Sequence, residues 1–330
     1  MTSLAPYVRI LAQGKGRARS MTQDEAESAM ALMLSGAPAP EAVGAILMLL
    51  RMKGETAPEI AGFTAAARGA LPGGWPGPAP DLDWPSYAAG RTRGLPWFLL
   101  SARLVARLGH RVLLHGWNSH QSAHASVRAS LGDLGIPVCQ TTAAAVQALQ
   151  ARNIAYLPLE TLSPALMRLL GLREVLGLRS CVNTVLRMLN PGSAPAAVQG
   201  VFHPPYRELQ ADAAQLLGQP ALSVLKGGGG EFEHHPTKDI AIFGLRDGAP
   251  WTGTTGIHAD GRRRLAETLS DPADLAAIWQ GRKTDDFAEA VVISTAALAL
   301  DTLGVADPEA TAARAWAARH DTPAQPEFTP

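Results

Sequence analysis

The sequence is poor in several features that would place a protein in a special class. Its 330 residues contain only two cysteines, Cys139 and Cys181, which argues against a disulfide framework and predicts two inert core thiols. Aromatic residues make up 5% of the chain, and 29 basic residues balance 29 acidic ones. A balanced chain has no overall field to attract a polyanion, so any such site must come from local clustering.

Long hydrophobic runs are also missing. The first residues run into a basic stretch without the apolar run that a secretory signal needs. The most apolar window, Ala288 to Gly304, is interrupted by polar residues, so it predicts a buried helix and not a bilayer span. Together with the two reduced thiols, these features predict a cytoplasmic protein with no membrane partner.

The first 70 residues predict a helical domain. Thr22 and Glu25 have the spacing of a capping box that starts a helix, and Gly36 is placed to end it. The apolar positions of the next two expected helices are Val43, Ile46, Leu47, Leu50, Ile60, Phe63 and Ala67. Because the segment from Val43 to Leu50 carries more apolar surface than a three-helix layer can bury, we expect a homodimer paired through these helices.

A stretch rich in proline and glycine, residues 71–80, cannot hold a regular element and is expected to be a hinge. Beyond it, apolar runs alternate with helical patterns, which predicts a larger α/β domain with a mainly parallel sheet at 81–162 and 191–319. Helices within 163–190 are expected to rejoin the helical domain, and 320–330 to form a disordered tail. The expected strands are Arg111–His115, Ile154–Leu157, Ala197–Phe202, Leu222–Leu225 and Ile240–Phe243.

Several segments carry a resemblance to a known family. They are the window Ala31 to Arg68 with its Lys53-Gly54-Glu55-Thr56 turn, the strand Val112 to Gly116, and the segment Arg173 to Ser180 followed by Asn183 and Asn190-Pro191. These segments resemble anthranilate phosphoribosyltransferase, of glycosyltransferase family 3. The resemblance spans nearly the whole chain and implies a nucleoside phosphorylase/phosphoribosyltransferase-like fold, a homodimer, and, if the protein is active, phosphoribosyl transfer.

The chain departs from that family where phosphoribosyl pyrophosphate would bind. The family's Gly-Thr-Gly-Gly-Asp loop reads Tyr87 to Arg91 here, and Leu114 replaces the lysine of a Lys-His-Gly-Asn motif. The acidic pair that holds magnesium in the family survives only as Glu231 and Glu233. The resemblance therefore implies a vestigial substrate pocket, formed by Gly90, His115, Gly116, Asn118, Arg173, Gly230, Glu231 and Glu233.

Each of these features has a plainer interpretation. The run Gly227 to Gly230 is either an anion cradle or a flexible turn. Arg173 either binds a planar carboxylate or forms an ion pair on a helix surface. Glu231 and Glu233 are either an acid pair with a weak magnesium site or, more commonly for such residues, solvated loop acids. No cofactor is required in this interpretation, and magnesium would be needed only by an active enzyme.

The losses fit a divergent branch of the superfamily, the YbiB-like proteins. The basic segment Gly14 to Arg19 and the turn Gly230 to Pro236 resemble that branch, which implies DNA binding without transfer. The residues expected to contact DNA phosphates are Lys15, Arg17, Arg19, Arg91, Arg93, Arg103 and Arg107. Two alternatives stay open: these charges form a solvated face, or the chain is a working transferase or phosphorylase that takes a small phosphorylated ligand.

Overall fold

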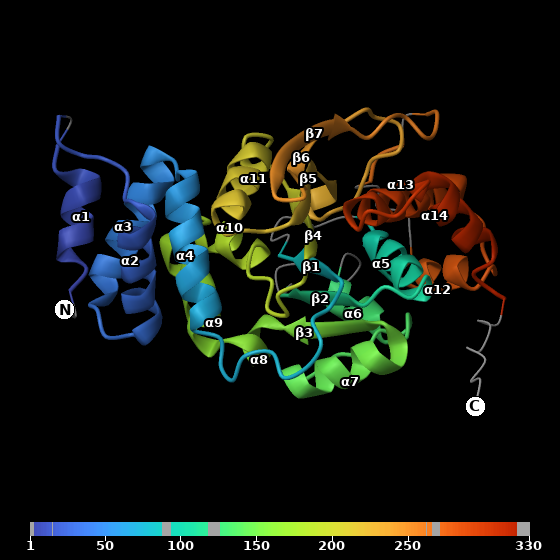
Figure 1. Cartoon of the computed structure of the whole chain (residues 1–330), viewed down its shortest axis with the longest axis horizontal. Coiled ribbons are helices and arrows are strands. Elements are labelled where there is room, and N and C mark those ends of the chain that lie inside the picture. The colour runs from blue at the N-terminus through green and yellow to red at the C-terminus, as the bar shows by residue number, and fades with distance from the viewer. Residues whose placement is uncertain are drawn as a thin grey trace.

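The computed structural model describes residues 3–14, 16–87, 94–117, 126–261, 263–265 and 271–321. Figure 1 shows a row of helices at one end and a sheet covered by helices at the other, with the first described helix and the last one toward opposite ends of the molecule. Five of the residues singled out by sequence lie outside the described ranges, as does most of the expected tail. They are Lys15, Gly90, Arg91, Arg93 and Asn118.

The N-terminal helices begin and end where the sequence predicts, with one addition. They are α1 (Ala5–Ala12), α2 (Gln23–Ser35), α3 (Pro40–Lys53) and α4 (Ala57–Gly69). The Thr22 side chain and Glu25 form the predicted capping box, and Gly36 ends α2 in the left-handed conformation. Sequence reasoning did not predict α1, because it interpreted the first residues only as the start of a basic segment.

The apolar face of α3 is covered by the chain itself. Val43 is 7% exposed, and Ile46, Leu47 and Leu50 are fully buried. Part of that cover is α1, which packs on α3. The prediction that this segment carries more apolar surface than the chain can bury is therefore wrong. The homodimer stays a prediction, but this argument no longer supports it.

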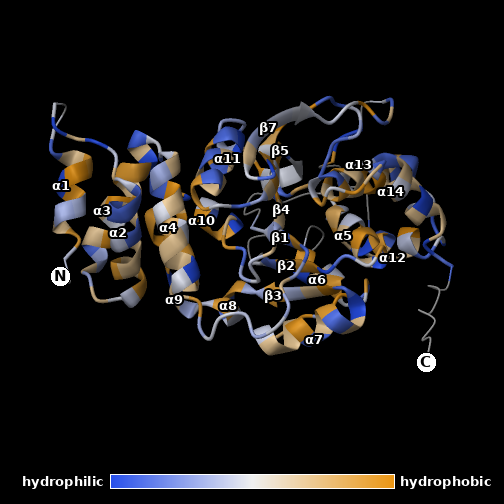
Figure 2. Ribbon diagram, in the orientation of Figure 1, coloured by the Kyte–Doolittle hydropathy of each residue, from blue (hydrophilic) through white to orange (hydrophobic). Residues whose placement is uncertain are grey.

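Helix α4 is buried on nearly all sides and joins the helical row to the rest of the molecule. It packs on α2 and also on α10 (Val182–Arg187) and α11 (Tyr206–Leu216). Figure 2 shows pale and orange residues along most of its length, as expected for a helix with no solvent face. A Cβ on Gly62 would lie 2.1 Å from the Gln23 carbonyl oxygen, so only glycine allows α2 and α4 to approach this closely.

The described strands form one seven-stranded sheet in the order β3-β2-β1-β4-β5-β6-β7. The strands are β1 (Leu82–Ser86), β2 (Val112–Gly116), β3 (Ile154–Pro158), β4 (Ala196–Val201), β5 (Ala221–Lys226), β6 (Ala241–Arg246) and β7 (Ala249–Thr254). The first five pair in parallel and the last two antiparallel, which confirms the predicted fold class. Sequence reasoning missed β1 and β7, because Asp83, Pro85 and Pro250 interrupt any apolar run.

Helices cover both faces of the sheet (Figure 1). One face carries α5 (Phe98–Arg107) and α13 (Asp286–Thr302), with α14 (Pro308–Ala317) packed on both. The other face carries α11 near β5 and β6, and α7 (Thr142–Arg152) near β2 and β3. The remaining described helices are α6 (Val127–Leu131), α8 (Leu159–Leu162), α9 (Pro164–Leu176) and α12 (Ala273–Trp279), and one 3-10 turn, η2, spans Gly228–Gly230.

Residues 71–80 contain no helix or strand, as predicted, and they run along α7. A Cβ on Gly77 would lie 2.7 Å from the Val146 side chain, so the linker is packed tightly at that point. Whether it acts as a hinge stays a prediction. In the part of the chain that the structure describes, no helix is both long and apolar enough to cross a membrane.

Candidate functional site

The candidate site lies where the chain order of the strands reverses. β1 sits between β2 and β4, so the C-terminal ends of these strands and of β5 meet at one edge of the sheet. In open α/β sheets, ligands bind at such a switch point. His115 and Gly116 end β2 there, and the glycine run that follows β5 folds over the same edge.

A chain of buried polar groups begins at His115. Its Nδ1 atom lies 2.9 Å from the Tyr87 hydroxyl, and its Nε2 atom lies 3.2 Å from Asp83 Oδ1, an ion-pair distance without hydrogen-bond alignment. Burial raises the pKa of Tyr87 well above its usual value, so the phenol keeps its proton while it shares this hydrogen bond with Nδ1. His115 thus lies between a buried hydroxyl group and a buried carboxylate.

Arg187 of α10 continues this buried chain. Its Nη2 atom lies 3.4 Å from the Tyr87 carbonyl oxygen, and the residue is 8% exposed. Burial lowers the pKa of Arg187 to about 10, and attraction to Glu231 opposes that shift, so the guanidinium stays charged at neutral pH. Gly230 has a φ of +96°, and a Cβ there would lie 3.4 Å from Arg187 Nη2. A glycine suits this position because the backbone is left-handed.

The interpretation of Glu231 and Glu233 as solvated loop acids is wrong. Glu231 is 1% exposed and Glu233 is fully buried. Ser86 Oγ donates to Glu231 Oε1 at 2.8 Å, and the Phe98 backbone N–H donates to Glu233 Oε2 at 3.0 Å. Both carboxylates are therefore held by the protein itself, the first at the end of β1 and the second at the start of α5.

An arginine-lined cleft of about 400 Å³ lies beside this edge, on the side of the helical row. Its cationic lining is Arg51 from α3, Arg173 and Arg179 around the end of α9, and Arg187 from α10. Burial lowers the pKa of Arg179, and repulsion from Arg173 and Arg51 lowers it further. The cleft also contains Gln210, whose fully buried amide has no hydrogen-bond partner at either end. Such a lining is suited to an anion.

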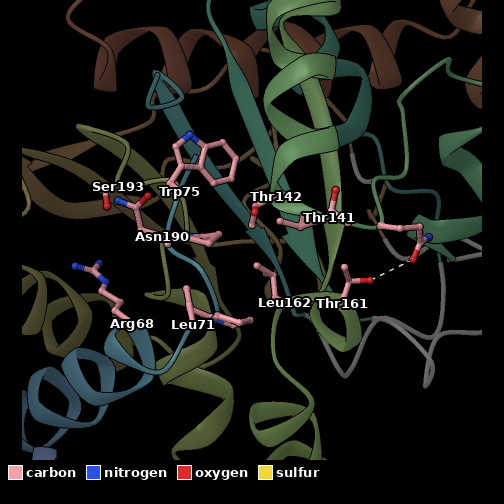
Figure 3. A pocket seen from close by; sticks show the side chains of 14 residues that line it. Arg68, Leu71, Trp75, Thr141, Thr142, Thr161, Leu162, Asn190 and Ser193 are labelled. Carbon is pink, nitrogen blue, oxygen red and sulfur yellow. Dashed lines mark hydrogen bonds between the residues drawn. The ribbon is translucent and has the colours of Figure 1, made fainter. Parts of the chain in front are cut away.

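A second cleft, of about 330 Å³, lies between the linker and α7 (Figure 3). Trp75 and Arg68 line one part of it, and Thr141 and Thr161 line another. Arg68 Nη2 donates to the Met188 carbonyl at 2.8 Å, while Trp75 Nε1 and Thr161 Oγ1 also donate within the protein. Among the described residues, Arg68 is the one charged residue in the lining of this second cleft, whereas four arginines line the first, so the first offers the stronger chemistry for an anion.

The described members of the predicted DNA-contact set do not gather on one surface. Arg17 is exposed, and Arg19 forms an ion pair with Glu25 at 2.7 Å near the N-terminus. Arg103 lies 4.3 Å from the ring centre of Trp279, and Arg107 Nη2 donates to the Ala318 carbonyl at 3.0 Å. Both arginines belong to α5, which lies away from the N-terminal helices (Figure 1), and they contact α12 and the residue that follows α14.

The structure brings together some of the residues predicted for a substrate pocket, and beside them it places others that sequence reasoning missed. His115, Gly116, Gly230, Glu231 and Glu233 meet at the sheet edge, whereas Arg173 lines the arginine-lined cleft beside it. The missed residues are Arg51, Asp83, Tyr87, Arg179, Arg187 and Gln210. They are spread over segments that lie far apart in the sequence, and only Arg179 stands in a local pattern. The arginine-rich segment around the end of α9 was the one signal available.

Comparison with known proteins agrees with this architecture. A model of the glycosyl transferase family, helical bundle domain, matches residues 5–70. An anthranilate phosphoribosyltransferase from Bacillus caldotenax is 30% identical over 234 residues, which cover 70% of this chain and 95% of that protein. The chain belongs to the anthranilate phosphoribosyltransferase family.

Other members of the anthranilate phosphoribosyltransferase family extend the match. The protein from Methylocella silvestris is 28% identical over 306 residues, covering 90% of this chain and 86% of that one. The crystal structure of the Thermus thermophilus protein has a TM-score of 0.75 at 23% identity, covering 94% of this chain and 93% of that one. The Saccharomyces cerevisiae protein in complex with PRPP and Mg has a TM-score of 0.76 at 16% identity, covering 96% and 93%. At these identities the two structures support the fold alone.

Proposed function

We propose that this member of the family binds nucleic acid without regard to sequence and does not transfer a phosphoribosyl group. The observation that carries the proposal is the arginine-lined cleft. Arg179 lies close to two other guanidinium groups. Besides its burial, repulsion from Arg173 and Arg51 lowers its pKa. Phosphate oxygens entering the cleft would relieve this repulsion and accept charge-assisted hydrogen bonds.

A second group of basic residues lies in and beside the N-terminal basic segment that the sequence singled out. Lys53 lies two residues after Arg51 in the last turn of α3, and its Nζ atom lies 3.0 Å from Ser20 Oγ. Ser20 directly follows Arg19, and Arg17 is exposed nearby in the chain. Glu59 and Glu25 neutralise Lys53 and Arg19 in part. In the proposal, Arg17 is a phosphate contact separate from the arginine-lined cleft.

The residues present do not fit the magnesium and PRPP that are bound in the yeast relative. Glu231 and Glu233 are buried and turned toward Ser86 and the start of α5. Within the described residues, no group of three or more His, Cys, Asp or Glu side chains is placed to hold a metal ion. Leu114, at the position of the expected lysine, is fully buried in the core beneath α5 and supplies no charge. We therefore derive no catalytic step through a metal or PRPP.

A second candidate function is glycosyl transfer with divergent phosphate ligands, either by a phosphoribosyltransferase or by a nucleoside phosphorylase. Its support is the family itself, whose curated members match nearly their whole length and are named as transferases. Arg173, in the arginine-lined cleft, would then bind the carboxylate of an aromatic acceptor through its planar fork.

The proposal is tested by fluorescence anisotropy with short labelled duplexes of unrelated sequence across a salt series. We expect affinity to fall steeply with salt and to depend little on sequence. Arg51→Ala and Arg179→Ala should each reduce the slope of log affinity against log salt by about 0.9. Arg314→Ala, which removes an exposed arginine of α14 at the far end of the molecule, is the matched control and should leave the slope unchanged.

A turnover assay with PRPP, magnesium and anthranilate runs in parallel. We expect no release of pyrophosphate above the rate without protein. Salt-insensitive DNA binding, or equal slopes for wild type and both cleft variants, would reject nucleic-acid binding through this cleft. Anthranilate-dependent turnover at ordinary enzyme rates would instead establish the second candidate.

A further inference from the structure

Helix α5 begins without a local cap. Its N-cap residue, Trp97, makes no capping side-chain hydrogen bond. The Phe98 N–H instead donates to the carboxylate of Glu233, which is 135 positions away in sequence, at 3.0 Å. The unpaired N–H groups and the dipole at a helix N-terminus favour an anion. In this protein that anion is one of its own side chains, and it is fully buried.

The glycine run closes over the same carboxylate. A Cβ on Gly228 would lie 2.6 Å from Glu233 Oε1, and the Gly228 N–H donates to the Glu233 carbonyl oxygen at 3.4 Å. A Cβ on Gly227 would lie 1.7 Å from the Glu231 carbonyl oxygen. The glycine run, which the sequence analysis considered as an anion-binding loop, is thus folded against Glu231 and Glu233. No space is left for an anion between the glycines and these residues.

We propose that Glu233 is a built-in replacement for a phosphate. Its carboxylate occupies the anion-binding position formed by the start of α5 and the glycine loop, and so keeps inorganic phosphate and pyrophosphate out. The charge excludes a second anion because like charges repel strongly in a buried site. The carboxylate also caps α5, so the position remains stable without a ligand. This inference does not depend on nucleic-acid binding, which involves the arginine-lined cleft.

Two variants separate charge from occupancy. Glu233→Gln keeps an oxygen that can accept from the Phe98 N–H but removes the charge, whereas Glu233→Ala removes the whole anion and opens the space. Glu208→Gln is the matched control, because Glu208 is an exposed acid in the first turn of another helix, α11. Thermal unfolding is followed in sodium phosphate and in sodium chloride of equal ionic strength, and pyrophosphate binding is measured by titration calorimetry.

We expect wild type and Glu208→Gln to give the same baseline, in which phosphate and pyrophosphate bind only through the arginine-lined cleft. Glu233→Ala should unfold about 2 to 6 °C lower in chloride, regain most of that loss in phosphate, and bind pyrophosphate at least tenfold more tightly than wild type. Glu233→Gln should lower the unfolding temperature less than Glu233→Ala does. If the alanine variant does not fold, the same measurements on Glu233→Gln test the proposal. DNA affinity should be unchanged in every variant that folds.

Two results would overturn the proposal. One is wild-type protein that phosphate stabilises as much as it stabilises Glu233→Ala. The other is a Glu233→Gln or Glu233→Ala variant that is as stable as wild type and gains no affinity for pyrophosphate. If the wild-type protein does not bind DNA, the proposed function is wrong, but this inference about Glu233 is unaffected.

Discussion

Glu59 is the polar centre of the helical row, and its removal is the most informative single perturbation of this part of the protein. The side chain is fully buried. Its Oε1 atom accepts from the Met21 N–H at 2.9 Å, and its Oε2 atom accepts from Lys53 Nζ, the Thr56 N–H and Thr56 Oγ1, each at 2.9 Å. One carboxylate thereby joins the segment before α2, the end of α3 and the start of α4.

The cost of Glu59→Ala follows from which donors lose their partner. Breaking a buried ion pair costs about 3 to 5 kcal/mol when the remaining charge stays buried. The Lys53 side chain is 25% exposed and keeps Ser20 as a partner, so it can turn toward water and the low end applies. The Met21 N–H, in a residue that is 2% exposed, is left unpaired, which alone costs about 1 to 3 kcal/mol. Added to the low end of the ion-pair cost, this gives an expected total loss of about 4 to 6 kcal/mol.

The chain contains its own control for this measurement. Thr22 with Glu25, at the start of α2, and Thr56 with Glu59, at the start of α4, are both capping boxes. The Glu25 side chain is 28% exposed, so Glu25→Ala should cost only about 1 kcal/mol. Urea unfolding followed by circular dichroism measures both variants. A Glu59→Ala variant that loses no more stability than Glu25→Ala would refute the argument that burial of this carboxylate decides the cost.

Four further predictions concern other parts of the molecule. Burial lowers the pKa of His234 to about 4, so between about pH 4 and 6.5 the unfolded state binds a proton more readily than the folded state. The free energy of unfolding should therefore fall by up to about 3 kcal/mol as the pH drops through that range. Thermal unfolding across this range should show that His234→Asn removes most of the pH dependence. Burial raises the pKa of both thiols, so Cys139 and Cys181 should not react with a thiol reagent in the native protein and should both react in denaturant. Gly200→Ala would place a Cβ 2.0 Å from the backbone carbonyl carbon of Glu231 and should lower stability by at least about 3 kcal/mol. Gly171→Ala, in α9, would have nothing within 4 Å of its Cβ and should be neutral or stabilising. Equal unfolding midpoints for the two variants would contradict this. Finally, sedimentation at micromolar concentration should show the predicted homodimer, and a monomer there would reject it.

The helical row and most of the sheet could be predicted from sequence because their signals are local. The capping box at Thr22 and the left-handed Gly36 each act within one turn of helix, and five of the strands are short apolar runs. β1 escaped prediction because it needs no apolar run: Asp83 is buried next to His115, and Trp84 packs against Phe98 and Phe232. Only residues far away in sequence make such a strand stable.

The fold class and the family could be predicted from sequence, because they depend on which residues occupy which positions along the chain. The tertiary structure alone decided what the surviving residues do. Nothing local indicates that Glu233 would cap α5, or that Arg51 would lie beside Arg173 and Arg179 in one cleft. Those contacts join elements more than a hundred positions apart, and burial and charge at such contacts are set by packing and not by local pattern.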